Sequence, residues 1–127
     1  MTPTRATIGD VPFFPEEVPT ASVPDLPTER LTLLDVREDD EWRAGHAPGA
    51  LHIPLSDVPA RMDELADMPD DQPIFVVCRT GGRSSQATAF LNANGYAAVN
   101  VAGGMKSWET EGRPVVGEYP DTAPGVL

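Results

Sequence analysis

The sequence predicts an α/β protein whose parallel or mostly parallel sheet carries helices on both faces. Short apolar stretches alternate with segments that carry helix signals, and this alternation is typical of strand–helix–strand units. Two of the stretches, at 31–36 and 74–77, are apolar almost throughout, as expected of strands covered on both faces. The length of 127 residues suits one domain.

The expected strands are short and are bounded by proline, glycine or polar residues. They lie at 31–36, 50–53, 74–77 and 97–101, with a short edge strand near 17–20. Pro54 stops the strand at 50–53, because proline cannot donate to a ladder of hydrogen bonds.

Four helices are expected between and after these strands. The first spans 38–44 and ends at Gly45, and the second begins near Ser56, whose hydroxyl can cap it. The third ends near Gly95, and the fourth is short and carries Trp108.

Both ends of the chain are rich in proline or glycine and lack apolar periodicity, which disfavours long helices and central strands. We therefore expect a proline-rich arm at 1–16, a folded domain at 17–116 and a tail at 117–127. The two end segments are expected on the surface of the domain.

The charge balance restricts the partners. With 20 acidic and 9 basic residues the chain has a formal charge of -11, which repels nucleic acid and anionic membranes. No apolar run approaches the ~20 residues that a membrane span needs, and the first residues do not resemble a signal peptide. We expect a cytoplasmic protein that binds neither nucleic acid nor membranes.

The chain contains one cysteine, Cys78, which cannot form an internal disulfide. It also cannot resolve its own thiol chemistry, so any such chemistry must finish on an external acceptor. Two histidines and one cysteine, widely spaced, do not match a metal pattern, and neither a phosphate-binding loop nor a dinucleotide motif occurs. We expect no metal and no cofactor.

Cys78 follows the strand at 74–77, and sites in open α/β sheets lie at the carboxyl ends of strands. Gly81 and Gly82 let the chain turn tightly and point successive N–H groups inward, and the helix that follows adds its positive end. Such a cradle stabilises a thiolate, which is the nucleophilic form, so the pKa of Cys78 should fall below its ordinary value of about 8.5. The alternative is a buried, inert cysteine, but this does not call for two glycines and two arginines directly after it.

Several blocks, in the right order, resemble the rhodanese homology domain, the thiosulfate sulfurtransferase family. They are DVRE at 35–38, EW at 41–42, GHAPGA at 45–50, IP at 53–54, CRTGGRS at 78–84, GY at 95–96 and GGMKSW at 103–108. His52 stands where the family usually has asparagine. The resemblance covers about residues 17–116.

The resemblance implies a small five-stranded parallel sheet and a ping-pong reaction. Thiosulfate, or a similar sulfane donor, is attacked by the Cys78 thiolate and leaves as sulfite. The persulfide sulfur then passes to cyanide, or to a thiol or protein acceptor. The expected activity is that of a thiosulfate sulfurtransferase.

The length of the loop separates this activity from a related one. Four residues lie between Cys78 and Arg83, as in the sulfurtransferases, whereas five would resemble tyrosine phosphatases and arsenate reductases. A shorter loop makes a tighter ring of amides, sized for one sulfur. Two alternatives stay open: a persulfide carrier or interaction module with little turnover on thiosulfate, and a phosphatase-type enzyme on the same fold.

The residues after Cys78 are expected to bind the donor and cradle the persulfide: Arg79, Thr80, Gly81, Gly82, Arg83 and Ser84. Arg79 is expected to point outward toward the donor, while Arg83 steadies either the loop or the donor unless it forms a structural ion pair. Ser84 or Ser85 is expected to cap the following helix.

Five further residues are expected to support the site or the core. The resemblance implies that Asp35 and Arg37 brace the loops around the pocket. A thiolate that is already formed needs no general base, so His46 is expected to be a packing residue. Trp42 and Trp108 are expected to be core anchors.

Overall fold

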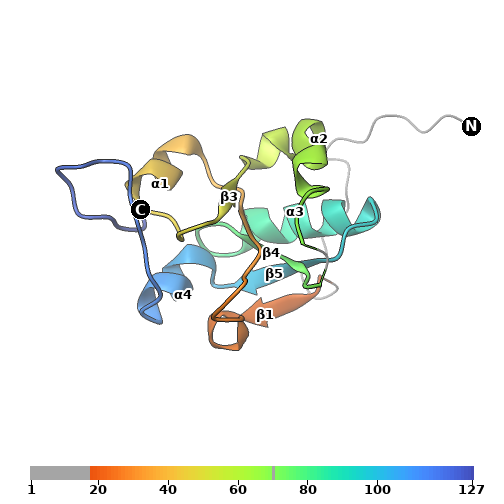
Figure 1. The fold of residues 1–127 in the computed structure, drawn as a ribbon, viewed down its shortest axis with the longest axis horizontal. Coiled ribbons are helices and arrows are strands. Elements are labelled where there is room, and N and C mark those ends of the chain that lie inside the picture. Colours follow the sequence, from red (N-terminus) through yellow and green to blue (C-terminus); the bar gives the residue numbers. More distant parts are fainter. Residues whose placement is uncertain (1–17, 70) are drawn as a thin grey trace, which may run out of the picture.

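The computed structural model describes residues 18–69 and 71–127, so the arm expected at 1–16 lies outside the described residues. The described chain forms a five-stranded sheet in the order β1-β5-β4-β2-β3, with every neighbouring pair parallel (Figure 1). The strands are β1 Thr20–Ser22, β2 Leu33–Asp35, β3 Leu51–His52, β4 Ile74–Val77 and β5 Ala98–Ala102. The predicted fold class is confirmed, and so is the parallel sheet of five strands.

The central strand β4 defines the two faces of the sheet. All four of its residues are buried, and their side chains alternate between the faces. Ile74 and Val76 pack into one hydrophobic cluster, while Phe75 and Val77 pack into the other. A continuous apolar strand is what a sheet covered on both sides requires.

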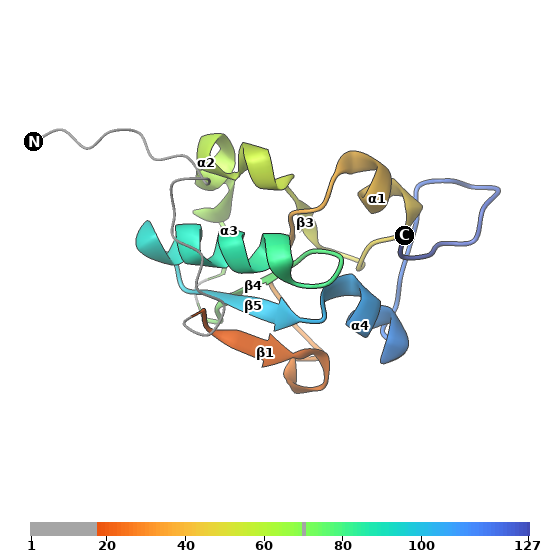
Figure 2. The ribbon, with the colours of Figure 1, turned by 180° about the vertical axis from the view of Figure 1, so that it is seen from behind.

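Helices cover both faces of the sheet. The helices α2 and α3 lie on the same side, where Phe90 and Leu91 of α3 enter the cluster of Ile74 and Val76 (Figure 2). The helix α4 covers the other side and contributes Met105 and Trp108 to the second cluster. The α-helices are α1 Asp39–Ala44, α2 Val58–Arg61, α3 Gly82–Ala93 and α4 Gly104–Thr110, and short 3-10 helices lie at Val23–Asp25, Leu55–Asp57 and Met62–Leu65.

Most element boundaries differ slightly from the sequence prediction, although β4 is predicted to the residue. The edge strand begins at Thr20 instead of near residue 17. The prediction that Ser56 caps the second helix is wrong, since Ser56 lies within a 3-10 turn and Asp57 occupies the cap position without a side-chain hydrogen bond. Gly95, with φ of 89°, follows the end of α3 in the left-handed conformation that glycine tolerates, as predicted.

The tail returns to the domain and packs against α1 and the loop after it (Figure 1). Directly before the tail, Val116 forms an antiparallel bridge with His46, and within the tail the N–H of Gly125 donates to the carbonyl of Ala44 at 3.0 Å. Val126 is buried in the cluster beneath α4. The tail is therefore a surface segment, as expected, except for one side chain that belongs to the core.

No helix in residues 18–69 and 71–127 combines the length and apolarity that crossing a membrane would take.

The contact between Gly45 and the tail gives a test of how the tail is held. A Cβ at Gly45 would collide with the main chain of Gly125, so Gly45→Ala is expected to lower the free energy of unfolding by about 1–3 kcal/mol. The same substitution on the other side of this contact, Gly125→Ala, is the matched control, because the nearest atom to its new Cβ lies 4.0 Å away. Urea denaturation of both variants checks this, and equal stabilities would show that the tail adjusts freely.

Candidate active site

Cys78 lies directly after β4, at the carboxyl edge of the sheet, and a tight loop leads from it into α3. Gly81 is the cap residue of α3 and has φ of 122°, a conformation that residues with a Cβ rarely adopt. The loop therefore requires glycine at this position. The structure confirms the predicted order of strand, cysteine, glycine turn and helix.

The sulfur of Cys78 is surrounded by hydrogen-bond donors. The N–H of Gly81 lies 3.0 Å from Sγ, and the hydroxyl oxygen of Ser84 lies 3.3 Å from it. The thiol is almost fully buried, with 1% of the residue exposed. Thr80, Gly81 and Ser84, all in the predicted cradle, are thus brought around the sulfur.

Two opposing influences act on the ionisation of Cys78. Burial is the largest and raises the pKa of the thiol. Hydrogen bonds from the Ser84 hydroxyl and from the backbone N–H groups of Ser84, Gly81 and Thr80 favour the thiolate, and together they lower the pKa below its ordinary value. The donors therefore outweigh burial, as the loop sequence predicts.

The prediction that Ser84 or Ser85 caps α3 is wrong. Gly81 occupies the cap position, and no side chain there accepts from the helix. The hydroxyl of Ser85 instead donates to the carbonyl of Gly81 at 2.7 Å, while the hydroxyl of Ser84 points at the sulfur and at Asn100. A helix cap must precede the first turn, and both serines already lie inside it.

The start of α4 supports the loop from behind, and sequence reasoning missed this. The N–H of Met105 donates to the carbonyl of Cys78 at 2.8 Å, and the N–H of Lys106 donates to the carbonyl of Arg79 at 3.0 Å. Gly104 has φ of 56°, and a Cβ there would collide with the main chain of Cys78 and Arg79. The pair of glycines at 103–104 was the available signal, since only glycine allows this approach.

Arg83 forms a forked ion pair with Glu41 of α1. Its two terminal nitrogens lie 2.7 and 2.9 Å from the two carboxylate oxygens of Glu41. This bidentate geometry is the strongest form of such a pair. The alternative stated for Arg83, a structural ion pair, is the one found.

The ion pair shifts the pKa values of both partners. The hydrogen bond from Arg83 is the main cause that lowers the pKa of Glu41 to about 2, although partial burial opposes it. The same hydrogen bond raises the pKa of Arg83 above its ordinary value. Glu41 also accepts from the N–H of Glu38 and so closes the N-terminal capping box of α1.

Asp35 and Arg37 form a second ion pair, which is fully buried. Their side chains are 0% exposed, and Arg37 Nη2 lies 2.7 Å from Asp35 Oδ2. Arg37 also donates to the carbonyls of Glu41 at 3.3 Å and Gly45 at 2.7 Å. The pair thus joins the end of β2 to the interior of α1 and to Gly45, which ends it, and has no contact with the sulfur among the described hydrogen bonds.

Arg79 differs from the other arginines of the site. Its Nε donates to the main-chain oxygen of Leu127 at 2.7 Å, so the guanidinium is engaged by the tail at the rim of the loop. Lys106 holds the same segment through the carbonyl of Val126 at 3.0 Å. The rim therefore includes tail residues, which sequence reasoning did not place near the site.

Trp42 lies outside both core clusters, half-buried, so the prediction that it is a core anchor is wrong. Its ring stacks on His46, with centroids 3.6 Å apart, and on His52, with centroids 4.7 Å apart. His46 is thereby a packing residue, as predicted, and also bonds to the carbonyl of Trp42 at 2.8 Å. Trp108, by contrast, is buried in the core.

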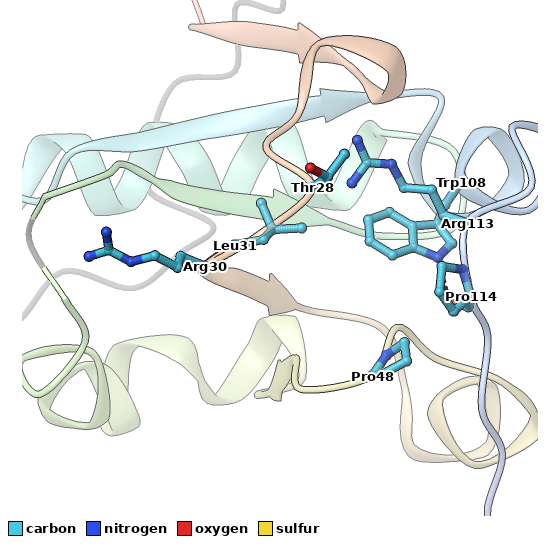
Figure 3. Close-up of a pocket in the computed structure, with 7 residues that line it drawn as sticks. All are labelled: Thr28, Arg30, Leu31, Pro48, Trp108, Arg113 and Pro114. Carbon is cyan, nitrogen blue, oxygen red and sulfur yellow. Dashed lines mark hydrogen bonds between the residues drawn. The ribbon is translucent and has the colours of Figure 1, made fainter.

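Two hollows on the surface differ in whether residues of the loop after Cys78 line them. One borders the loop and is lined by Thr20, Thr80, Gly81, Gly82, Ser85, Asn100, Ala102 and Gly103. The other lies beside Trp108, with the guanidinium of Arg113 5.1 Å from the indole centroid (Figure 3). This hollow lies on the face of the sheet that α4 covers, and none of the residues that line it belongs to the loop at 78–84. Of these two hollows, only the first is lined by residues of the loop that follows Cys78.

Within residues 18–69 and 71–127, no group of three or more histidine, cysteine and acidic side chains is placed to hold a metal ion.

Comparison with known proteins assigns the family. Residues 23–111 match the model of the rhodanese-like domain. The chain belongs to the rhodanese-like family. A protein of Allochromatium vinosum, named "Sulfurtransferase", is 40% identical over 90 residues, which cover 70% of this chain and 81% of the relative. The Bacillus subtilis protein named "Putative sulfurtransferase YtwF" is 39% identical over 101 residues, covering 78% and 95% of the two chains.

A solved structure agrees with this assignment. The rhodanese-related protein of Thermoplasma volcanium has 34% sequence identity and a TM-score of 0.69, and the match covers 77% of this chain and 97% of that one. The rhodanese fold is thereby shown, and the named relatives support sulfur transfer as the general activity of the family. The tail beyond residue 111 lies outside the family match.

The pair of Glu41 and Arg83 predicts a pH dependence of stability. Because the pKa of Glu41 falls from 4.5 to about 2 on folding, the pair contributes stability above pH 4.5, and this contribution is lost as the pH falls toward 2. Glu41→Gln keeps an acceptor for the capping box but removes the charge, so it is expected to cost about 1 kcal/mol near neutral pH. The difference from the natural chain should shrink below pH 4.5.

Urea denaturation between pH 2.5 and 7 measures this difference. Glu64→Gln is the matched control, because Glu64 pairs with Arg61 on the surface, where both side chains are more than one third exposed. That variant is expected to change stability very little. A Glu41→Gln penalty that stays constant with pH would show that the charge of Glu41 does not brace the loop.

Proposed function

We propose that this protein is a thiosulfate sulfurtransferase that carries a sulfane sulfur on Cys78 as a persulfide. The ring of donors around Sγ, with Gly81 N–H at 3.0 Å and the Ser84 hydroxyl at 3.3 Å, is the observation that supports this. Such a ring stabilises an anionic sulfur, whether it belongs to a thiolate or to a persulfide. The family relatives support the same general chemistry.

The first half of the reaction loads the protein. The Cys78 thiolate attacks the outer sulfur of thiosulfate, a bond forms between Sγ and that sulfur, and the sulfur–sulfur bond of the donor breaks. Sulfite leaves with the bonding electron pair. The terminal sulfur of the new persulfide takes over the negative charge, and the N–H groups of the loop lie where they can donate to it.

The second half unloads the protein onto an acceptor outside the chain. Cyanide or an acceptor thiolate attacks the terminal sulfur, and the electrons of the broken bond return to Cys78 as a thiolate. Because Cys78 is the only cysteine, no internal thiol can compete for the persulfide. A reducing compartment such as the cytoplasm suits this cycle, since the cysteine must return to the reduced state.

The engagement of Arg83 disfavours a phosphatase. A phosphatase of this loop type would use its arginine to hold the equatorial oxygens of a tetrahedral oxyanion. Here both terminal nitrogens of Arg83 are bound to Glu41 of α1. The loop also has only four residues between Cys78 and Arg83, which makes a smaller ring of amides.

Intact-protein mass spectrometry tests the proposal. Reduced protein incubated with thiosulfate is expected to gain the mass of one sulfur, and cyanide or a thiol should remove it with release of thiocyanate or a persulfide. Cys78→Ser should gain nothing. Ser84→Ala keeps the nucleophile but removes one donor, so it is expected to load roughly tenfold more slowly at neutral pH.

Other outcomes separate the alternatives. A persulfide that forms only from a protein donor, and not from thiosulfate, would indicate a sulfur carrier in place of a thiosulfate sulfurtransferase. Sulfur mass retained by Cys78→Ser would contradict the mechanism. Hydrolysis of an aryl phosphate that disappears in Cys78→Ser would restore the phosphatase.

The charge of the chain predicts how turnover responds to salt. Arg79 and Arg83 are engaged by Leu127 and Glu41, so the formal charge of -11 is expected to govern the approach of the thiosulfate anion. Raising ionic strength from about 0.01 to 0.1 M shortens the screening length from about 30 to 10 Å, and kcat/KM should rise. The rate of alkylation by neutral iodoacetamide should stay constant and is the control. A steady fall of kcat/KM would mean that the loop arginines dominate capture.

A further inference from the structure

The hydroxyl of Ser84 has two acceptors within reach but only one proton. Its oxygen lies 2.6 Å from Oδ1 of Asn100 and 3.3 Å from Sγ of Cys78. Ser84 is 0% exposed and Asn100 is 5% exposed, so water does not easily replace either contact. A hydroxyl donates one hydrogen bond, so Ser84 cannot donate to both groups at the same time.

The number of available protons allows one consistent set of hydrogen bonds among Cys78, Ser84 and Asn100 for each charge state of the sulfur. When Cys78 is a neutral thiol, the S–H donates to the Ser84 oxygen and the Ser84 hydroxyl donates to Oδ1 of Asn100. When the sulfur is anionic, the Ser84 hydroxyl donates to Sγ. Asn100 then satisfies the Ser84 oxygen only if its amide turns over and presents the N–H₂ group.

Asn100 lies in a part of the sheet where a polar side chain is exceptional. It lies in β5 between Thr20 of β1 and Val76 of β4, and the residues on either side, Val99 and Val101, pack into the opposite core cluster. A buried amide in such a strand costs free energy unless it is hydrogen-bonded. Its Nδ2 would lie 3.9 Å from a Cβ built on Gly81, so the amide borders the loop itself.

We propose that Asn100 is a positioning residue for Cys78, which sets the direction of the Ser84 hydroxyl and reverses its own amide when the sulfur changes charge. The proposal rests on the proposed function in one respect, namely that Cys78 acts as a thiolate. Asparagine suits this role because it offers a donor and an acceptor of almost the same shape. The buried hydroxyl therefore keeps a partner throughout the catalytic cycle.

Apart from residue 100 itself, the charged groups around the loop remain the same in every variant of Asn100. Ionic attraction from Arg83 already acts on Cys78, and Arg83 is itself neutralised by Glu41. The charged groups on the loop and on the elements that pack against it are Arg79 on the loop, Arg83 on α3, Glu38, Asp39, Asp40, Glu41 and Arg43 at α1, Lys106 and Glu109 on α4, and the paired Asp35 and Arg37 at and after the end of β2. A change in reactivity between variants of Asn100 thus reports on the hydrogen bonds of Ser84 and on the substituted side chain.

Two substitutions at this position should act in opposite directions. Asn100→Asp offers Ser84 only acceptors and adds a charge, so the hydroxyl turns away from the sulfur and the thiolate is disfavoured. Asn100→Leu removes the competing acceptor, so the hydroxyl has only the sulfur to donate to. Because the added charge of Asn100→Asp would by itself disfavour the thiolate, both substitutions are also made together with Ser84→Ala, which separates the effect of the charge from that of the hydroxyl.

The pH dependence of alkylation by iodoacetamide, followed by mass spectrometry at the single cysteine, measures the thiolate directly. Below the midpoint, Asn100→Asp is expected to react about tenfold more slowly than the natural chain, which corresponds to a midpoint about one unit higher. Asn100→Leu is expected to react at the same rate or faster. In the Ser84→Ala background, Asn100→Leu should have no effect.

The matched control is Asn92→Leu, because Asn92 braces the start of β5 through both the N–H and the carbonyl of Ala98 and has no contact with Ser84. It should lower stability in thermal unfolding and leave the midpoint unchanged. If Asn100→Asp does not fold, Asn100→Leu alone decides, and a rise in its midpoint equal to that of Ser84→Ala overturns the proposal. Equal shifts of Asn100→Asp with and without Ser84 also overturn it. Alkylation needs no sulfur donor, so failure of the proposed sulfur transfer would show separately, as absence of persulfide.

Discussion

The geometry of the site depends on the ion pair and hydrogen bonds that the buried guanidinium of Arg37 makes. It pairs with Asp35 and also donates to the carbonyls of Glu41 and Gly45, so one side chain fixes where β2 ends and how α1 lies over it. Removing one partner of a fully buried pair typically costs about 3–5 kcal/mol, because the other charge is left without compensation. The position of α1 then fixes Glu41, which holds Arg83 at the start of α3. The loop that follows Cys78 is thus tied to the core through two successive ion pairs.

On its other side, the same loop is held by main-chain hydrogen bonds and not by ion pairs. The main chain at Cys78 and Arg79 receives hydrogen bonds from the first turn of α4, and the lack of a side chain at Gly104 permits this close contact. Braced from both sides, the N–H groups around the sulfur are oriented before any anion arrives. Preorganised donors stabilise charge without the cost of reorganisation, which is how the pKa of a buried thiol can still lie below its ordinary value.

Local signals made the class of the fold, the strand β4, and the loop with Cys78 predictable. A continuous apolar stretch reports burial on both faces, and the run CRTGGRS combines a nucleophile with the glycines that its turn requires. The partners of the charged groups were not predictable in the same way. Arg83 and Glu41 are 42 residues apart, and nothing in either segment indicates which of 20 acidic residues the arginine meets. Asn100 was missed for a related reason, since one polar residue in an apolar strand does not reveal its partner.

The tail brings its own consequence for how this protein is handled. Leu127 lies against Arg79, with a side chain that is about half exposed at the entrance to the loop. Any sequence joined after it, whether an affinity tag, a fluorescent protein or a second domain, would begin beside the side chain of Arg79, the residue that follows Cys78. Such a fusion would act as a local obstacle or, with suitable chemistry, as a tethered acceptor held at high effective concentration. A fusion at this residue therefore offers a way to place a chosen thiol near the loop that carries Cys78 without any change to the loop itself.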